Sequence, residues 1–98
     1  MARATWTTSG VFTGRGGART VEAGIVTGDL TVRTTWDGAT AEVAVRYTGT
    51  EKWFTLTGSP EPCRSEHDSR RLHQAVVEAV RVGGGAVVPQ PVRMGGWP

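Results

Sequence analysis

The chain contains little of what commonly cross-links or anchors a small protein. Cys63 is the only cysteine among 98 residues, so no internal disulfide can form. No apolar run approaches the roughly 20 residues that a membrane helix needs, and the first residues, MARATWTTSG, lack the apolar core of a signal peptide. A single thiol fits a reducing compartment. We therefore expect a cytoplasmic protein without a membrane segment.

Recognisable catalytic and cofactor motifs are also absent. The stretch GRGGAR, residues 14–19, has neither the spacing of a dinucleotide-binding fingerprint nor the Gly-Lys-Ser/Thr of a Walker loop. Paired carboxylates and a serine-centred nucleophile motif are missing as well. Cys63 precedes a predicted helix, whose N-terminus lowers the pKa of a thiol, but only His67 lies near it as a base. We predict a non-enzymatic protein with no cofactor.

One set of potential metal ligands occurs, in the spacing C-x3-H-x5-H formed by Cys63, His67 and His73. Two histidines six residues apart on a helix are separated by about 600° of rotation, so they point about 120° apart. Structural zinc sites use four nitrogen or sulfur ligands, and no fourth ligand is evident. We expect no metal site, and we expect both histidines at the surface.

The first half of the chain has the character of a β-sheet. All fourteen threonines lie within the first 57 residues, and threonine favours a pleated, half-exposed surface. Asp37-Gly38 is the strongest hairpin signal because a tight turn of this type needs positive φ angles. Alternation and turn residues predict strands over 5–12, 20–27, 30–36, 39–48 and 53–57.

The alternation also assigns side chains to the two faces of this sheet. The core face is predicted to carry Trp6, Phe12, Val21, Ala23, Ile25, Leu30, Val32, Thr34, Trp36, Ala41, Val43, Val45 and Tyr47. The other face is predicted to carry Thr31, Arg33, Thr35, Glu42 and Arg46. Adjacent residues cannot share a face, so either Trp53 or Phe54 must point outward.

A helix is predicted over 66–82, with Ser65 as its N-cap and Gly83-Gly84-Gly85 at its end. Its apolar stripe consists of Leu72, Ala75, Val76, Ala79 and Val80. Pro89 and Pro91 exclude an ordinary central strand in the tail. Residues 86–88 form either a short edge strand or part of an extended arm.

These elements predict one α+β domain over residues 1–85, with an extended C-terminal arm over 86–98. The domain is an antiparallel meander of four to five strands with one C-terminal helix packed on one face. A single helix covers one side of a sheet, so the threonine- and arginine-rich side is left for water or for a polar partner.

The distribution of charge favours an anionic partner. Net charge is only +2, but residues 1–21 contain three arginines and no acidic residue. Arginine binds phosphate bidentately, although abundant arginine is also typical of proteins from GC-rich genomes. GRGGAR is therefore either a phosphate-binding loop or a hairpin turn with solvated arginines. The candidate residues for binding DNA or RNA are Arg15, Arg19, Arg33, Arg46, Lys52 and Trp53, with Trp53 stacking on a base if it points outward.

Glu42 on the same face argues against a surface that binds phosphate alone, and it is placed to pair across strands with Arg33 or Arg46. The alternative function is a protein-interaction module, such as an adaptor, an accessory protein or an antitoxin-like protein. It would form a homodimer or bind a protein partner through a sheet edge or through the arm, where Val88, Met94 and Trp97 are the candidate contacts.

Overall fold

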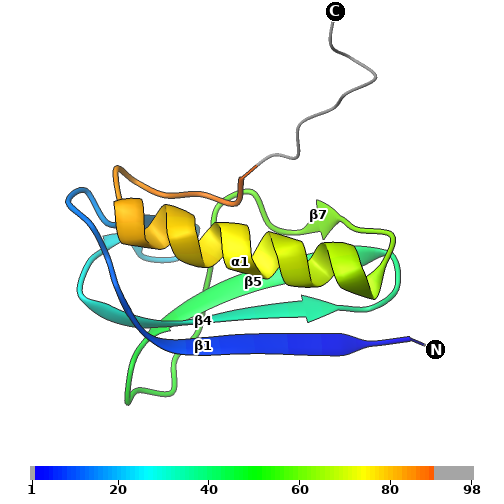
Figure 1. Ribbon diagram of the computed structural model, residues 1–98. Coiled ribbons are helices and arrows are strands. Elements are labelled where there is room, and N and C mark those ends of the chain that lie inside the picture. Colours follow the sequence, from blue (N-terminus) through cyan, green and yellow to red (C-terminus); the bar gives the residue numbers. More distant parts are fainter. Residues whose placement is uncertain (1, 90–98) are drawn as a thin grey trace, which may run out of the picture.

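The computed structural model describes residues 2–89 and contains an antiparallel sheet, a small hairpin and one helix (Figure 1). The main sheet has the order β1-β4-β5-β6, and β7 also pairs with β5. Its strands are β1 (Ala4–Phe12), β4 (Asp29–Trp36), β5 (Thr40–Tyr47), β6 (Phe54–Thr55) and β7 (Glu61–Pro62). The helix α1 (Glu66–Val82) lies along one face of this sheet. The predicted α+β architecture is therefore confirmed, while residues 90–98 of the predicted arm lie outside the described residues.

The predicted strand over 20–27 is wrong. The chain there forms a separate hairpin of two short strands, β2 (Ala18–Thr20) and β3 (Gly24–Val26), and β1 pairs with β4 instead. The Thr20 hydroxyl accepts a hydrogen bond from the Ala23 amide and donates one to the Gly24 carbonyl, which makes a turn of residues 21–23. Val21 and Ile25, predicted to be in the core, are consequently 66% and 45% exposed.

The core face of the main sheet otherwise follows the predicted alternation along β4 and most of β5. Leu30, Val32, Thr34 and Trp36 are all buried, as are Ala41, Val43 and Val45. Tyr47, at the end of β5, is 39% exposed and is a correction to the prediction.

Phe12 is a second correction on β1. The pairing with β4 shifts between Thr8 and Val11, and Gly10 has a φ of +69°. A bulge of this kind inserts an unpaired residue and exchanges the two faces of the strand beyond it. Val11 is therefore buried, and Phe12 is 66% exposed.

The helix begins and ends as predicted, but its buried face is rotated from the predicted stripe. The Ser65 hydroxyl accepts a hydrogen bond from the Asp68 amide, and the Gly83 amide donates to the Ala79 carbonyl. The buried residues are Ser69, His73, Val76, Val77 and Val80, whereas Ala75 is exposed.

Polar contacts explain this rotation. The indole N–H of Trp6 on β1 donates to the Ser69 hydroxyl over 2.9 Å. The His73 ring lies between the hydroxyls of Thr8 and Thr34, at 2.8 Å and 2.9 Å from its two nitrogens. The predicted surface position of His73 is wrong, because both ring nitrogens have hydrogen-bond partners inside the domain.

The glycine-rich stretch after β1 is bound to the end of the helix. The Gly84 amide donates to the Arg15 carbonyl over 2.6 Å, the Gly85 amide to the carbonyls of Gly16 and Gly17, and the Ala86 amide to that of Gly17. GRGGAR is therefore not a turn that joins two adjacent strands of one sheet. Its carbonyl groups accept from the amides that follow α1, and the Gly14 amide donates to the Val80 carbonyl in the last turn of the helix.

The hairpin and the segment after α1 cover the outer edge of β6. The Val21 amide donates to the Thr55 carbonyl, and the Thr57 amide donates to the Arg19 carbonyl. The Glu22 carboxylate accepts hydrogen bonds from the Thr55 amide and hydroxyl, which lower the pKa of Glu22. At the opposite side of the sheet, β1 pairs only with β4, so its second edge is unpaired within residues 2–89.

No helix in the described part of the chain combines the length and the apolar character that a membrane crossing requires.

Candidate functional site

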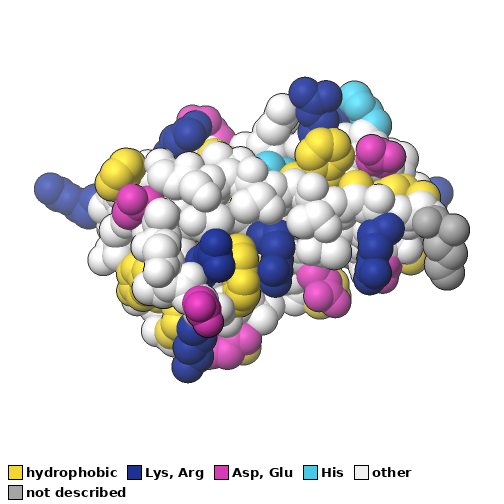
Figure 2. Space-filling model, turned by 90° about the horizontal axis from the view of Figure 1, so that it is seen from below, with side chains coloured by type: hydrophobic (Ala, Val, Ile, Leu, Met, Phe, Trp, Pro, Cys, Tyr) yellow, Lys and Arg dark blue, Asp and Glu magenta, His cyan; other side chains and the backbone are white. Residues whose placement is uncertain are grey.

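The face of the main sheet opposite α1 is polar and carries two arginines near its centre. Arg33 on β4 lies opposite Ala44, and Arg46 on β5 lies opposite Thr31. Figure 2 shows this face, with dark blue basic side chains and magenta acidic ones spread across it. Thr31 is 1% exposed, but the groups that cover it include the hydroxyls of Ser9 and Thr48. The predicted polar face is thus present.

Trp53, which immediately precedes β6, points to this face and contacts both arginines. The guanidinium carbons of Arg33 and Arg46 lie 3.9 Å and 4.6 Å from the centre of its ring. The pairing register separates the two arginines by two residues along the sheet, and the indole occupies the space between them. We call these three side chains the Arg-Trp stack. Cation–π contacts of this kind contribute about 0.5–1 kcal/mol each at exposed sites.

Phe54 points the other way and settles the alternative left by the sequence. It lies opposite Val45, packs against the core, and contacts Tyr47 edge to face with ring centres 6.4 Å apart. Trp53 is therefore the outward residue. Guanidinium groups lie against its ring, so it holds the arginines in place, and its stacking on a base stays a prediction.

One nitrogen of the stack has no hydrogen-bond acceptor among the described residues. The Nε atom of Arg46 is buried and makes no hydrogen bond. Glu42, predicted to pair with one of the arginines, lies opposite Thr35, and no ion pair joins it to Arg33 or Arg46. Buried donors without partners are rare in folded proteins, which sets the Arg-Trp stack apart from the rest of this face.

The other predicted basic residues lie elsewhere. Arg15 and Arg19 flank the glycine stretch at the C-terminal end of α1, and Arg19 Nη2 lies 3.8 Å from where a Cβ on Gly85 would be. Lys52 lies 5.5 Å from the centre of the Phe54 ring, and its positive charge contributes to the lowered pKa of Glu22. Of the six predicted nucleic-acid residues, Arg33, Arg46 and Trp53 thus converge, whereas Arg15 and Arg19 lie at the end of α1 and Lys52 lies against Phe54.

Val88, one of the predicted partner residues of the tail, is buried in the core. Val88 is 1% exposed, belongs to the main hydrophobic cluster, and donates its amide to the Thr57 carbonyl. Ala86 is buried in the same cluster and bridges to Ala18. Residues 86–88 therefore pack as a short extended segment, while Met94 and Trp97 lie outside the described residues.

Cys63 and His73 occupy separate buried environments. Burial raises the pKa of the Cys63 thiol, which donates to the Ser65 carbonyl over 3.5 Å. Burial lowers the pKa of His73. Within residues 2–89, no three potential ligands of the His, Cys, Asp and Glu types are gathered to hold a metal ion.

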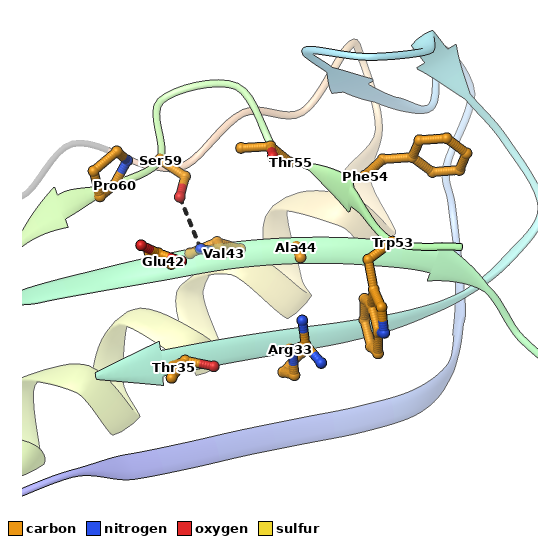
Figure 3. A pocket seen from close by; sticks show the side chains of 10 residues that line it. All are labelled: Arg33, Thr35, Glu42, Val43, Ala44, Trp53, Phe54, Thr55, Ser59 and Pro60. Carbon is orange, nitrogen blue, oxygen red and sulfur yellow. Dashed lines mark hydrogen bonds between the residues drawn. The ribbon is translucent and has the colours of Figure 1, made fainter. Parts of the chain in front are cut away.

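A groove of about 330 Å³ beside the stack was not predicted. It lies over Ala44, and Arg33, Glu42, Trp53 and Thr55 are among the residues that line it (Figure 3). The only signal in the sequence is the small alanine between Glu42 and Arg46 on the outer face of β5. Comparison with known proteins adds no assignment, because no protein-family model, curated protein or solved structure matches this chain significantly.

Proposed function

We propose that this chain is a non-enzymatic module that binds nucleic acid through the outer face of its main sheet. The observation that carries the proposal is the Arg-Trp stack, in which one indole contacts two guanidinium groups and thereby holds two positive charges close together on the outer face. Guanidinium donors match the oxygens of a phosphate group in pairs. Side chains that are already held in position lose less entropy when they bind.

The surroundings of the stack suit a polyanion better than an apolar partner. Thr7 lies opposite Arg33 on the neighbouring strand, and Thr35 and Thr55 line the adjoining groove. Hydroxyl groups commonly contact phosphate and sugar oxygens. With a net charge of only +2, we expect weak and salt-sensitive binding, with a Kd on the order of micromolar at low salt.

Loss of the two stacked arginines should weaken binding strongly. We expect Arg33→Ala/Arg46→Ala to lower the affinity for a labelled 20-nucleotide DNA strand by about tenfold or more, measured by fluorescence anisotropy. The slope of log K against log salt should also fall by about 1.4, because each phosphate contact on a single strand contributes about 0.7.

The matched control is Arg70→Ala/Arg71→Ala, which removes the same charge from exposed positions of α1. Arg15→Ala/Arg19→Ala tests the basic group at the helix end in the same way. Equal losses in all three double variants would show that only net charge matters, and absence of binding by the unaltered protein at micromolar concentration would overturn the proposal.

A second candidate function rests on the unpaired edge of β1. This strand is nine residues long, and its side chains include no charge and no proline, the features that commonly protect an edge. The bulge before Val11 protects one end and leaves residues 4–8 open. The arrangement favours pairing with β1 of a second copy, which would form a homodimer with a continuous sheet.

Dimerisation predicts twice the chain mass of 10.4 kDa in light scattering between about 10 µM and 1 mM protein. Thr5→Lys should shift the protein to monomer, because it places like charges at the edge. Thr35→Lys, on the neighbouring inner strand, should not. A chain ending at Pro89 separates this contact from any made by the remaining tail, and a monomeric mass at every concentration would exclude the edge contact.

A further inference from the structure

The groove beside the Arg-Trp stack lies where the edge of β5 loses its strand partner. β6 pairs with Ala44 and Val45, while β7 pairs with Thr40 and Ala41. Between these strands the chain leaves the edge, and the Ser59 hydroxyl accepts the hydrogen bond of the Val43 amide over 2.9 Å (Figure 3). The methyl group of Ala44 does not fill the space above the sheet, so a hollow remains next to the stack.

The two ends of this groove differ in chemistry. Arg33 and Trp53 lie at one end, and Glu42 lies at the other, near Ser59 and Pro60 (Figure 3). The Glu42 side chain is exposed, and no described side chain donates to its carboxylate. A ligand that spans the groove would therefore meet hydrogen-bond donors at one end and an acceptor at the other.

We propose that this groove holds one unpaired base that carries an exocyclic amino group, from a single-stranded nucleic acid whose phosphates contact Arg33 and Arg46. This inference rests on the proposed function and specifies its ligand. A carboxylate accepts from the amino group of cytosine, whereas thymine presents a carbonyl oxygen at the same position. A volume of about 330 Å³ is at the lower end of small-molecule sites, which suits one base rather than several.

A base that enters the groove must be unstacked and unpaired, which favours single strands as ligands. In a duplex the bases are stacked and their amino groups are paired, so reaching the groove would require a base to be extruded at additional energetic cost. In a single strand the base can turn into the groove while the backbone follows the arginines. The domain should therefore bind single strands more tightly than duplex of the same length.

The test compares labelled oligo(dC), oligo(dT) and a duplex of equal length by anisotropy at pH 7.5. We expect oligo(dC) to bind about tenfold more tightly than oligo(dT), because only cytosine can donate a hydrogen bond from its amino group to the charged Glu42 carboxylate. Glu42→Ala should bring this ratio close to one, and so should Ala44→Leu, which fills the groove on the outer face. Ala44→Leu should keep the salt dependence that Arg33 and Arg46 provide.

The outcomes separate the two proposals. If no oligonucleotide binds, the proposed function fails. Three results would show that the groove does not hold a base, although binding depends on Arg33 and Arg46: oligo(dC) and oligo(dT) bind equally well, the preference for oligo(dC) persists in Ala44→Leu, or duplex binds as tightly as single strands. In each of these cases only the proposed function stands. Glu78→Ala, which removes a carboxylate from an exposed position of α1 and leaves both Glu42 and the hollow in place, is the control that should retain at least most of the ratio.

Discussion

Gly14→Ala should destabilise the domain by about 3 kcal/mol or more, measured by urea unfolding. A Cβ on Gly14 would overlap the Val82 carbonyl and would lie 2.5 Å from the Arg81 carbonyl oxygen. The obstacle is helix backbone, which cannot move aside as a flexible side chain would. The Gly14 amide also donates to the Val80 carbonyl over 3.1 Å, so a displaced loop would lose this bond as well. Such a loss is a large part of the 5–15 kcal/mol typical of small domains.

The matched control for Gly14 is Gly24→Ala. Gly24 has a φ of +66°, and a Cβ there would meet nothing within 4 Å, so the substitution introduces only backbone strain of about 1–2 kcal/mol. Gly14, by contrast, has no positive φ, and its penalty is entirely steric. If the two variants lost the same stability, the close approach between the glycine stretch and the helix end would not exist in solution.

His73→Ala should lower the free energy of unfolding by about 2–4 kcal/mol and remove most of the protein's pH dependence between pH 7 and 5. The His73 ring is 6% exposed and bonds Thr8 and Thr34 through its two nitrogens, so the variant leaves a cavity and two hydroxyls that lack a partner. A neutral imidazole has one donor and one acceptor, and both hydroxyls can complement it. Burial lowers the pKa of His73, so protonation favours the unfolded chain.

The sign of the pH effect follows from that shift. Above the ordinary histidine pKa of about 6.5, His73 is neutral in both states, and the full stability is present. As the pH falls below that value, the unfolded chain takes up a proton that the folded chain does not, so the unaltered protein should lose stability. His67→Ala, at an exposed helix position, should retain this loss. An unchanged pH profile in His73→Ala would contradict the assignment.

The sequence predicted the architecture well where a single local rule decides the outcome. Regular alternation along β4 identifies its buried residues, and a serine cap with a glycine terminator sets the ends of α1. The errors on β1 and at residues 20–27 arise at Gly10 and Gly24, where a positive φ interrupts an apparently continuous strand. Alternation cannot reveal such interruptions, because a glycine is compatible with either conformation.

The candidate site was partly predictable for the same reason. The outward positions of Arg33 and Arg46 follow from strand period alone. The position of the Trp53 ring between them depends on how β6 returns to β5, and the groove depends on where β6 ends and β7 begins. These are properties of tertiary structure with no local signal. The burial of His73 depends likewise on hydroxyls contributed by β1 and β4, far away in the sequence.

The carboxylate of Glu22 has a consequence for self-association. Together with the backbone of its hairpin, it blocks one margin of the main sheet by accepting the Thr55 amide, so β1 is the long margin that stays unpaired within residues 2–89. Growth into a filament by strand addition needs two open edges on every subunit, whereas a molecule with one open edge can only pair edge to edge with a second copy and stop. A Glu22→Ala change would free the Thr55 amide, but the backbone hydrogen bonds between Val21 and Thr55 and between Thr57 and Arg19 would still cover this margin, so the variant should not form fibres.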